Sequence, residues 1–188
     1  MIKIDSSKQK VWFTSDTHFF HTNIIKYCKR PFDSIEEMNR TLIENWNNVV
    51  SDNDLVFHLG DFAFGGFHTY ETIRPNLKGH IILITGNHDI KNVNIQNLVR
   101  LSKMFDRVEE MLTIHIDKRP IILCHYPIRC YPDGYWNLFG HVHSGPNSTS
   151  RDVLENKFKL TQYDVGVDNN NFTPISYLQI KNIINNGV

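Results

Sequence analysis

The stretch Val11-Trp12-Phe13-Thr14-Ser15-Asp16-Thr17-His18 (residues 11–18) starts the pattern that decides the fold. In it, four strand-forming residues are followed closely by a carboxylate and an imidazole. Similar blocks recur after later apolar runs, namely Gly60-Asp61, Gly86-Asn87-His88-Asp89, His125 and Gly140-His141-Val142-His143. Two neighbouring divalent ions need imidazole nitrogens, carboxylates and amide oxygens from several strand ends, and one carboxylate must bridge both ions. The pattern therefore predicts a two-metal hydrolase site.

Apolar periodicity predicts that strands and helices alternate in the first half of the chain. Ser34-Ile35-Glu36-Glu37 has the form of a capping box, so we expect a helix that begins after Ser34 and runs to Val49. The other expected elements here are strands at Val11–Thr14, Asp54–Leu59 and His80–Ile84 and helices at Tyr70–Leu77 and Asn92–Met104.

Beyond Arg107 the pattern changes to short strands separated by turns. The expected strands are Val108–Met111, Leu112–Ile116, Ile121–Leu123, Phe139–Val142, Tyr163–Val167 and Tyr177–Ile180. This order predicts an α/β fold in which two sheets pack face to face as a β-sandwich. We expect helices on both outer faces, because helices can cover only outer faces while the inner faces stay apolar. Residues 1–188 are expected to form a single domain, with its ligands at the carboxyl ends of strands.

Composition excludes some classes of protein. Lys+Arg and Asp+Glu balance at 20 each, and a formal charge of zero argues against a broad polyanion-binding face. The three cysteines, Cys28, Cys124 and Cys130, lack paired spacing and are expected to be reduced thiols. The N-terminus has no secretory apolar segment, and no run approaches the roughly 20 apolar residues of a membrane span. We therefore expect a cytoplasmic protein without a membrane partner.

With these motifs in this order, the chain resembles the calcineurin-like metallophosphoesterase superfamily. The stretches Ser15–Asn23, Leu77–His80 and Tyr163–Asp168 are similar to its small, cap-less bacterial and phage branch. The resemblance implies the four-layer αββα fold and phosphoester hydrolysis by attack of a metal-bridging hydroxide. It also implies that Asp16, His18, Asp61 and His143 hold one metal, and that Asp61, Asn87, His125 and His141 hold the other.

The residue types agree with that assignment. His141 and His143 lie two apart on a segment that reads as extended, so their side chains would point the same way and reach different ions of one pair. A mixed imidazole and carboxylate set suits Mn, Fe, Zn, Co or Ni better than Mg, whose sites are normally all oxygen. We expect two divalent transition-metal ions, with Mn(II) as the first choice.

Catalysis is expected to depend on Asp61 and His88. Asp61 is the bridging carboxylate, and two cations lower the pKa of a bridging water from about 15.7 toward 7, so that no general base is required. His88 matches the family's non-ligand histidine, which implies that it protonates the leaving oxygen or stabilises transition-state charge. Asp89 either orients His88 or caps the following helix.

Candidate substrate contacts lie near the first motif and after His125. His21 and Asn23 either contact phosphate or cap a turn, and Arg30 is a candidate phosphate clamp. The segment Tyr126–Asn137 mixes aromatic and basic residues, among them Tyr126 and Arg129, and either stacks a base and holds a phosphate or forms a folded rim loop.

We expect a metal-dependent phosphodiesterase that acts on a small or nucleotide-like phosphodiester. The alternatives are a phosphomonoesterase, a protein phosphatase, a nuclease and a non-catalytic binding scaffold. The lack of a second domain, the zero net charge and the absence of a strong nucleic-acid signature argue against the nuclease. The intact ligand set and His88 argue against the scaffold. The sequence leaves a homo-oligomer open.

Overall fold

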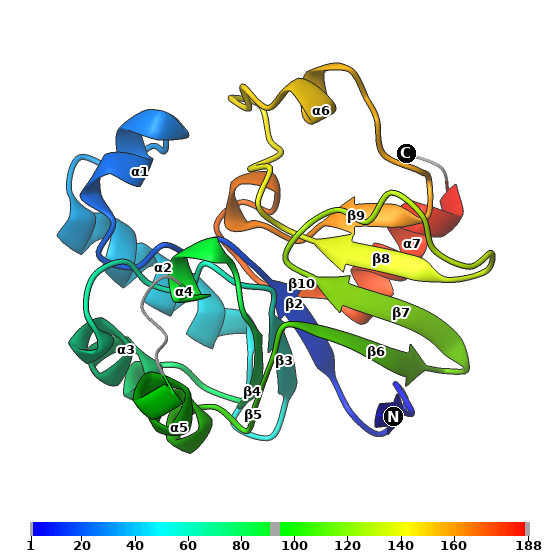
Figure 1. The fold of residues 1–188 in the computed structure, drawn as a ribbon, viewed down its shortest axis with the longest axis horizontal. Coiled ribbons are helices and arrows are strands. Elements are labelled where there is room, and N and C mark those ends of the chain that lie inside the picture. Colours follow the sequence, from blue (N-terminus) through cyan, green and yellow to red (C-terminus); the bar gives the residue numbers. More distant parts are fainter. Residues whose placement is uncertain (1, 91–94, 187–188) are drawn as a thin grey trace.

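The structure is a computed structural model that describes residues 2–90 and 95–186. Two five-stranded sheets face each other (Figure 1). The first sheet has the strand order β1 (Ile2–Ile4), β6 (Met111–Ile116), β7 (Arg119–Cys124), β8 (Trp136–Phe139) and β9 (Gln162–Asp164). The second sheet has the order β10 (Ile175–Ser176), β2 (Val11–Thr14), β3 (Leu55–His58), β4 (His80–Ile84) and β5 (Arg107–Glu109). The predicted two-sheet α/β sandwich is confirmed.

The strands that matter for the site are parallel. β2, β3, β4 and β5 run in one direction in the second sheet, and β7, β8 and β9 do so in the first. Parallel neighbours need long crossovers. In the second sheet these contain α2 (Ile35–Val49), α3 (Phe67–Ile73) and α5 (Ile95–Met104). The carboxyl ends of parallel strands therefore meet at one edge of each sheet.

Two apolar clusters hold the layers together. The cluster between the sheets contains fully buried side chains from both, including Phe13, Phe57, Ile114, Ile121 and Leu138. The second cluster lies between the other face of the β10–β5 sheet and its helices, and includes Met38, Leu42, Trp46, Val56 and Ile81. Strands β2 to β4 are thus apolar on both faces, as parallel strands covered on both sides must be.

The capping box that predicted α2 is present in the structure. The Ser34 side chain accepts a hydrogen bond from Glu37 N at 3.1 Å, and Glu37 reaches back to accept from Asp33 N at 2.8 Å. These bonds satisfy backbone donors that a helix start leaves without partners, which is why the helix begins at the predicted residue.

Helix cover differs between the sheets (Figure 1). Helices were expected on both outer faces, and on the β10–β5 sheet the helices α2, α3 and α5 cover the outer face. On the other side, α7 (Tyr177–Asn186) contacts β2, β9 and β10, and places Tyr177 and Ile180 in the core between the sheets. The loop that contains Phe158 also packs against this sheet. The Phe158 ring contacts Phe139 of β8, with the two centroids 4.9 Å apart.

One predicted element has the wrong type. Tyr177–Ile180 was expected as a strand but forms the first turn of α7. Ser176 and Gln179 make a second capping box, in which Ser176 N donates to Gln179 Oε1 at 2.9 Å and Gln179 N donates to Ser176 Oγ at 3.3 Å. Tyr177 and Ile180 both reach the core because residues three apart share a helix face.

Other differences concern boundaries. The expected strands Phe139–Val142 and Tyr163–Val167 begin and end earlier, as β8 and β9, because the chain turns away after each to form the site. The expected Tyr70–Leu77 helix begins at Phe67 and ends in a 3₁₀ turn, Arg74–Asn76, that contains Pro75. Residues 92–94 of the expected Asn92–Met104 helix lie outside the described residues. The structure adds β1, β10 and the short helices α1 (Thr22–Tyr27), α4 (Asn87–Ile90) and α6 (Arg151–Leu154).

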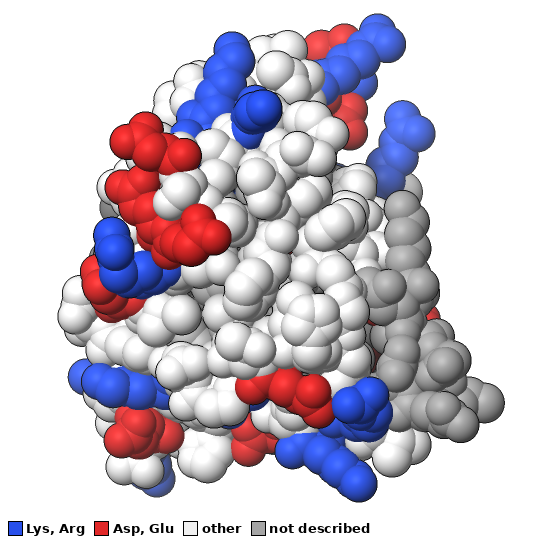
Figure 2. All heavy atoms as spheres, turned by 90° about the vertical axis from the view of Figure 1, so that its left-hand side faces the viewer, with Lys and Arg blue, Asp and Glu red and all other residues white. Residues whose placement is uncertain are grey.

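The helix-bearing side of the molecule mixes acidic and basic side chains around a largely uncharged middle (Figure 2). This distribution agrees with the formal net charge of zero. None of the helices in the described part of the chain has the length and apolar character needed to cross a membrane.

Candidate metal centre

The predicted ligands lie together because each follows a strand whose carboxyl end reaches the same region. The ligands come from the ends of β2 (Asp16, His18), β3 (Asp61), β4 (Asn87), β7 (His125) and β8 (His141, His143). Parallel strands gather such residues at one edge, and two packed sheets bring the two edges face to face.

The first predicted set is compact. His18 Nε2 lies 3.9 Å from Asp16 Oδ1 and 3.5 Å from Asp61 Oδ2, and His143 Nε2 lies 3.8 Å from Asp16 Oδ1. Atoms that bind one ion at about 2.1 Å lie about 3–4 Å from one another. These separations fit ligands of a shared cation.

The second predicted set meets the first at Asp61. His125 Nε2 lies 3.6 Å from Asp61 Oδ2 and 3.2 Å from Asn87 Oδ1. The His141 ring lies 5.1 Å from the His125 ring, measured between centroids. A single oxygen, Asp61 Oδ2, is therefore close to one imidazole from each set, as a bridging carboxylate would be.

Two buried atoms of this cluster have no hydrogen-bond partner among the described residues, Asp16 Oδ1 and His18 Nε2. Leaving such a group unsatisfied costs about 1–3 kcal/mol. The two atoms are 3.9 Å apart, so one cation between them would satisfy both. Together with the nitrogen and oxygen donor set, this indicates that the residues fit a divalent transition metal.

Burial and neighbouring charges shift several pKa values in the cluster. Burial raises the pKa of Asp61 to about 7, although His125 opposes the shift. Burial lowers the pKa of His143, but the carboxylates of Asp16 and Asp168 outweigh it and raise that pKa to about 11. Burial, reinforced by His143, holds the pKa of His18 well below its usual range, so this imidazole stays neutral and able to bind a metal.

The backbone at the ligands is unusual. Asp16, His18, Asp61, His141 and His143 all have positive φ, between 47° and 70°. For residues other than glycine this costs of order 1–3 kcal/mol each, and it persists where the surrounding structure enforces it, typically at functional sites. The expectation that His141 and His143 lie on an extended segment is therefore wrong. The strand ends at Phe139, and His141 N donates to Asp16 Oδ2 at 2.9 Å.

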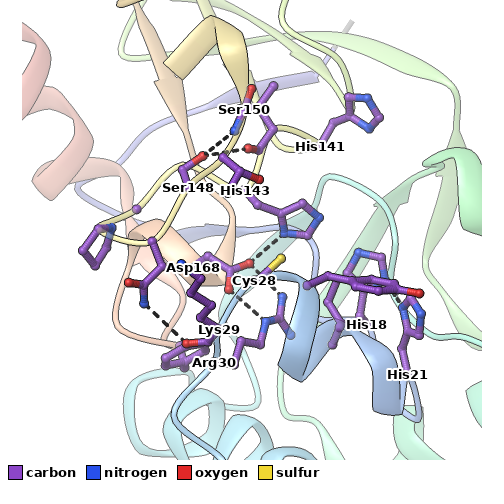
Figure 3. A pocket seen from close by; sticks show the side chains of 18 of the residues that line it. His18, His21, Cys28, Lys29, Arg30, His141, His143, Ser148, Ser150 and Asp168 are labelled. Atoms are coloured by element: carbon purple, nitrogen blue, oxygen red, sulfur yellow. Dashed lines mark hydrogen bonds and ion pairs between the residues drawn. The ribbon is translucent and has the colours of Figure 1, made fainter. Parts of the chain in front are cut away.

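Arg30 is linked to the predicted ligand His143 through Asp168 (Figure 3). Its Nε and Nη2 donate to the two oxygens of Asp168 at 2.8 Å, and Asp168 Oδ2 accepts from His143 Nδ1 at 2.8 Å. The other donors bind Asp16 O at 2.7 Å, Thr17 O at 3.1 Å and Met38 Sδ at 3.5 Å. All five guanidinium N–H groups have acceptors, which contradicts the expected role of a phosphate clamp.

In the described part of the chain, Asp89 binds the backbone of two loops. Its carboxylate is buried and accepts hydrogen bonds from Asp61 N at 2.7 Å, Phe62 N at 3.1 Å and Gly86 N at 2.8 Å. Tyr70 Oη also donates to it, at 2.5 Å. Asp89 therefore joins the loop after β3 to the loop after β4 and fixes Asp61 relative to Asn87.

His88 lies at the surface of the cluster. Its side chain is 25% exposed, and its Nε2 lies 3.9 Å from Asp61 Oδ2. The His88 ring meets the His18 ring edge to face at 5.1 Å. His88 is thus beside the predicted metals and open to a cavity, as a proton donor to a substrate must be.

A cavity of about 810 Å³ opens from the cluster, and the expected substrate contacts relate to it differently. His21 lines it, stacks on Phe64 at 4.2 Å, and has its Nδ1 3.3 Å from His18 Nδ1. Asn23 and Arg129 are exposed and do not belong to the described lining. Tyr126 does not line the cavity either; it is 42% exposed and packs against His141.

Sequence reasoning missed the residues that hold the ligands in place. Asp168 orients His143, and His58 belongs to a buried chain of hydrogen bonds behind Asp16. Asp168 ends the stretch Tyr163–Asp168 that carried part of the resemblance, so a signal for it existed. His58 was expected to be an ordinary strand histidine, and nothing in its spacing distinguished it.

Comparisons with known proteins agree with this geometry. The sequence profile of the calcineurin-like phosphoesterase family matches residues 9–169. The uncharacterized protein MJ1445 of Methanocaldococcus jannaschii is 36% identical over 186 residues, covering 96% of this chain and 94% of that protein. The Gene 66 protein of Mycobacterium phage L5 is 30% identical over 187 residues, covering 84% and 86%. The crystal structure of the protein of unknown function AQ665 from Aquifex aeolicus has a similar fold, with a TM-score of 0.68, 24% identity, and coverage of 93% of this chain and 99% of that one.

Proposed function

Since this chain belongs to the calcineurin-like phosphoesterase family and is a phosphoester hydrolase, we propose that it is a two-metal phosphodiesterase of small or nucleotide-like substrates. The observation that carries the proposal is the position of Asp61 Oδ2, 3.5 Å from His18 Nε2 and 3.6 Å from His125 Nε2. One carboxylate oxygen that faces both ligand sets suits two ions better than one.

The proposed ligands divide between two ions as the family resemblance implies. Asp16, His18, Asp61 and His143 would hold one ion, and Asp61, Asn87, His125 and His141 would hold the other. When bound, two divalent ions supply a water of lowered pKa and neutralise the phosphoryl oxygens. Mn(II) is the proposed metal, with Fe, Zn, Co and Ni as alternatives that the same donors accept.

His88 is the proposed proton donor to the leaving oxygen. Its imidazole borders the cavity next to Asp61 and is exposed enough to meet a bound phosphoester. A positioned general acid contributes roughly 100- to 10,000-fold to the rate. Neighbouring His18 is neutral and buried, so it does not compete for this role.

The wall of the cavity favours a diester over a monoester. A bidentate arginine with free donors is a frequent partner of a phosphate dianion. Arg30 is the arginine of the described cavity lining, and its donors are already used within the protein. A phosphodiester carries one negative charge fewer and needs no such clamp beside the metals.

Hydrolysis of two aryl substrates tests the proposal. Metal-stripped protein reloaded with Mn(II) is expected to cleave bis-p-nitrophenyl phosphate faster than p-nitrophenyl phosphate, and Asp61→Ala is expected to abolish both activities. Asp52→Ala, at an exposed carboxylate, is the control for the substitution itself. Faster monoester cleavage would make the protein a phosphatase, and activity retained by Asp61→Ala would remove the bridging carboxylate from the mechanism.

A further inference from the structure

The cavity extends beyond the metal centre as a cleft between α1 and the loop 145–152 (Figure 3). Its inner end is lined by histidines, and its outer end by Tyr27, Lys29, Asn147, Ser148, Thr149 and Ser150. Under the proposed function, the phosphoryl group lies at the inner end. The outer end must then hold an organic group attached to it. About 810 Å³ is within the range of sites that enclose a small ligand.

The α1 wall offers an aromatic face. Tyr27 is 66% exposed, and its ring lies nearly perpendicular to that of His21, with the two centroids 6.2 Å apart. Buried Ile24 fixes the same helix to the core. An aromatic side chain that is exposed inside a cleft and held by a packed helix suits stacking with a flat ring of the ligand.

The opposite wall offers small polar groups. Ser148 Oγ accepts from Ser150 N at 3.3 Å and donates to Val142 O at 3.4 Å, which ties the loop to the segment that carries His141. Asn147 Nδ2 donates to Lys29 O at 3.4 Å and so connects the two walls. Hydroxyl and amide groups both donate and accept, so this wall matches a ligand rich in hydroxyls, such as a sugar.

The charged side chains of the cleft leave one cation without an ion-pair partner among the described residues. Asp152 is paired with Lys157 at 3.1 Å, and Asp168 with Arg30 at 2.8 Å. Lys29 is exposed and has no ion pair within the described part of the chain. The two cations of the lining, Lys29 and Arg30, therefore balance its two carboxylates, and the Lys29 ammonium is available to face an anionic phosphoester.

We propose that this cleft is the subsite for a nucleoside substituent of the phosphodiester, with the base stacked on Tyr27 and the sugar against residues 147–150. The inference rests on the proposed function and deepens it. It also places substrate recognition outside the segment Tyr126–Asn137, which the sequence left open as either a substrate contact or a rim loop.

Two diesters that share a leaving group test the inference. The p-nitrophenyl ester of thymidine 5′-phosphate and methyl p-nitrophenyl phosphate both release p-nitrophenolate but differ in the retained group. We expect the Mn-loaded enzyme to favour the nucleoside ester at least tenfold in kcat/KM. Tyr27→Ala should lower that ratio about fivefold to a hundredfold, as the loss of one base–aromatic stack does, and Tyr27→Phe should keep it.

Tyr126→Ala is the matched control, because Tyr126 is also exposed beside the metal centre but lies outside the cleft. It is expected to leave the ratio of the two esters unchanged. Methyl ester turnover with a ratio near one, or an equal fall in both tyrosine variants, overturns the cleft assignment and leaves the phosphodiesterase intact. No turnover of either ester overturns the proposed function itself.

Discussion

At the scale of single residues, Arg30 shows how the same side chain can be assigned two roles. A lone arginine close to a metal-binding motif suggests a phosphate clamp. In the structure its side chain is fully buried, with Asp168 on one side and the carbonyls of Asp16 and Thr17 on the other. It therefore positions His143 and the Asp16 loop.

Arg30→Met tests this positioning role. Removing one partner of a buried ion pair leaves Asp168 uncompensated, which costs about 3–5 kcal/mol of unfolding free energy. Because Arg30 orients the proposed metal ligand His143 through Asp168, its loss is also expected to weaken metal binding, by roughly 10- to 100-fold. Urea unfolding and Mn(II) titration measure the two effects.

Arg40→Met is the matched control, since Arg40 forms an exposed pair with Glu44 at 3.9 Å. Its expected effect on unfolding is within about 0.5 kcal/mol. A variant of Arg30 that kept its stability and metal affinity but bound substrate less tightly would restore the phosphate-clamp role.

His58 gives a prediction about pH. Its Nδ1 accepts from Gly60 N at 3.2 Å, so Nε2 carries the proton and donates to Thr17 Oγ1 at 2.9 Å. Burial lowers the pKa of His58 to about 3, against 6.5 ordinarily. Below pH 6.5 this histidine therefore binds a proton in the unfolded chain but not in the folded protein. The free energy of unfolding falls as a result while the pH drops from about 6.5 toward 3.

His58→Asn should remove this dependence. Between pH 7 and pH 5 the wild type is expected to lose about 2 kcal/mol more unfolding free energy than the variant. Urea unfolding at both pH values measures it, and His80→Asn, at an exposed site, controls for the removal of a histidine. Equal losses in wild type and His58→Asn would contradict the buried, neutral state.

At the scale of elements, the sequence predicted those whose local signals agree with their packing. The capping box at Ser34 was sufficient to predict where α2 begins, and the apolar runs were sufficient to predict β2, β3 and β4. The helical state of Tyr177–Ile180 is not evident from the sequence, because four apolar-rich residues fit a strand as well as a helix turn. The cap that decides between them, Ser176, bonds to Gln179 within the same short segment. The left-handed turns at the ligands could not be predicted, because contacts between distant loops impose them.

The loops after β3 and β4 should not tolerate a side chain at Gly60. Gly60 has φ of +96°, and a Cβ there would lie 2.5 Å from Gly86 N and 2.7 Å from His125 Nδ1. Backbone strain alone would lower the free energy of unfolding of Gly60→Ala by about 1–2 kcal/mol. We expect the steric clash to lower it by several kcal/mol more and to weaken Mn(II) binding.

Gly134→Ala separates backbone strain from steric clash. Gly134 also has a positive φ, of +80°, but a Cβ added there would have nothing within 4 Å. Chemical unfolding with and without Mn(II) should show a small loss there and a large one at Gly60. Similar losses in both variants would mean that strain, and not the approach of the loops, decides the effect.

At the scale of the whole molecule, topology explains why a short list of motifs was informative. Each motif follows a strand, and parallel strands in two facing sheets bring all of them to one region. Their convergence could be predicted from the sequence. The cleft between α1 and the loop 145–152 could not, because it depends on how two segments without a repeating pattern fold beside the centre.

The proposed bridging of two metal ions by Asp61 is tested most directly by the metal content and the electron paramagnetic resonance spectrum of Mn-loaded protein. Wild type is expected to bind two Mn(II) per chain with a spectrum of exchange-coupled ions, and to melt at a higher temperature than metal-stripped protein, because the folded state alone binds the metal. Asp61→Asn should lose the coupling and at least one ion. One uncoupled Mn(II) per wild-type chain, or coupling that survives in Asp61→Asn, would contradict the claim.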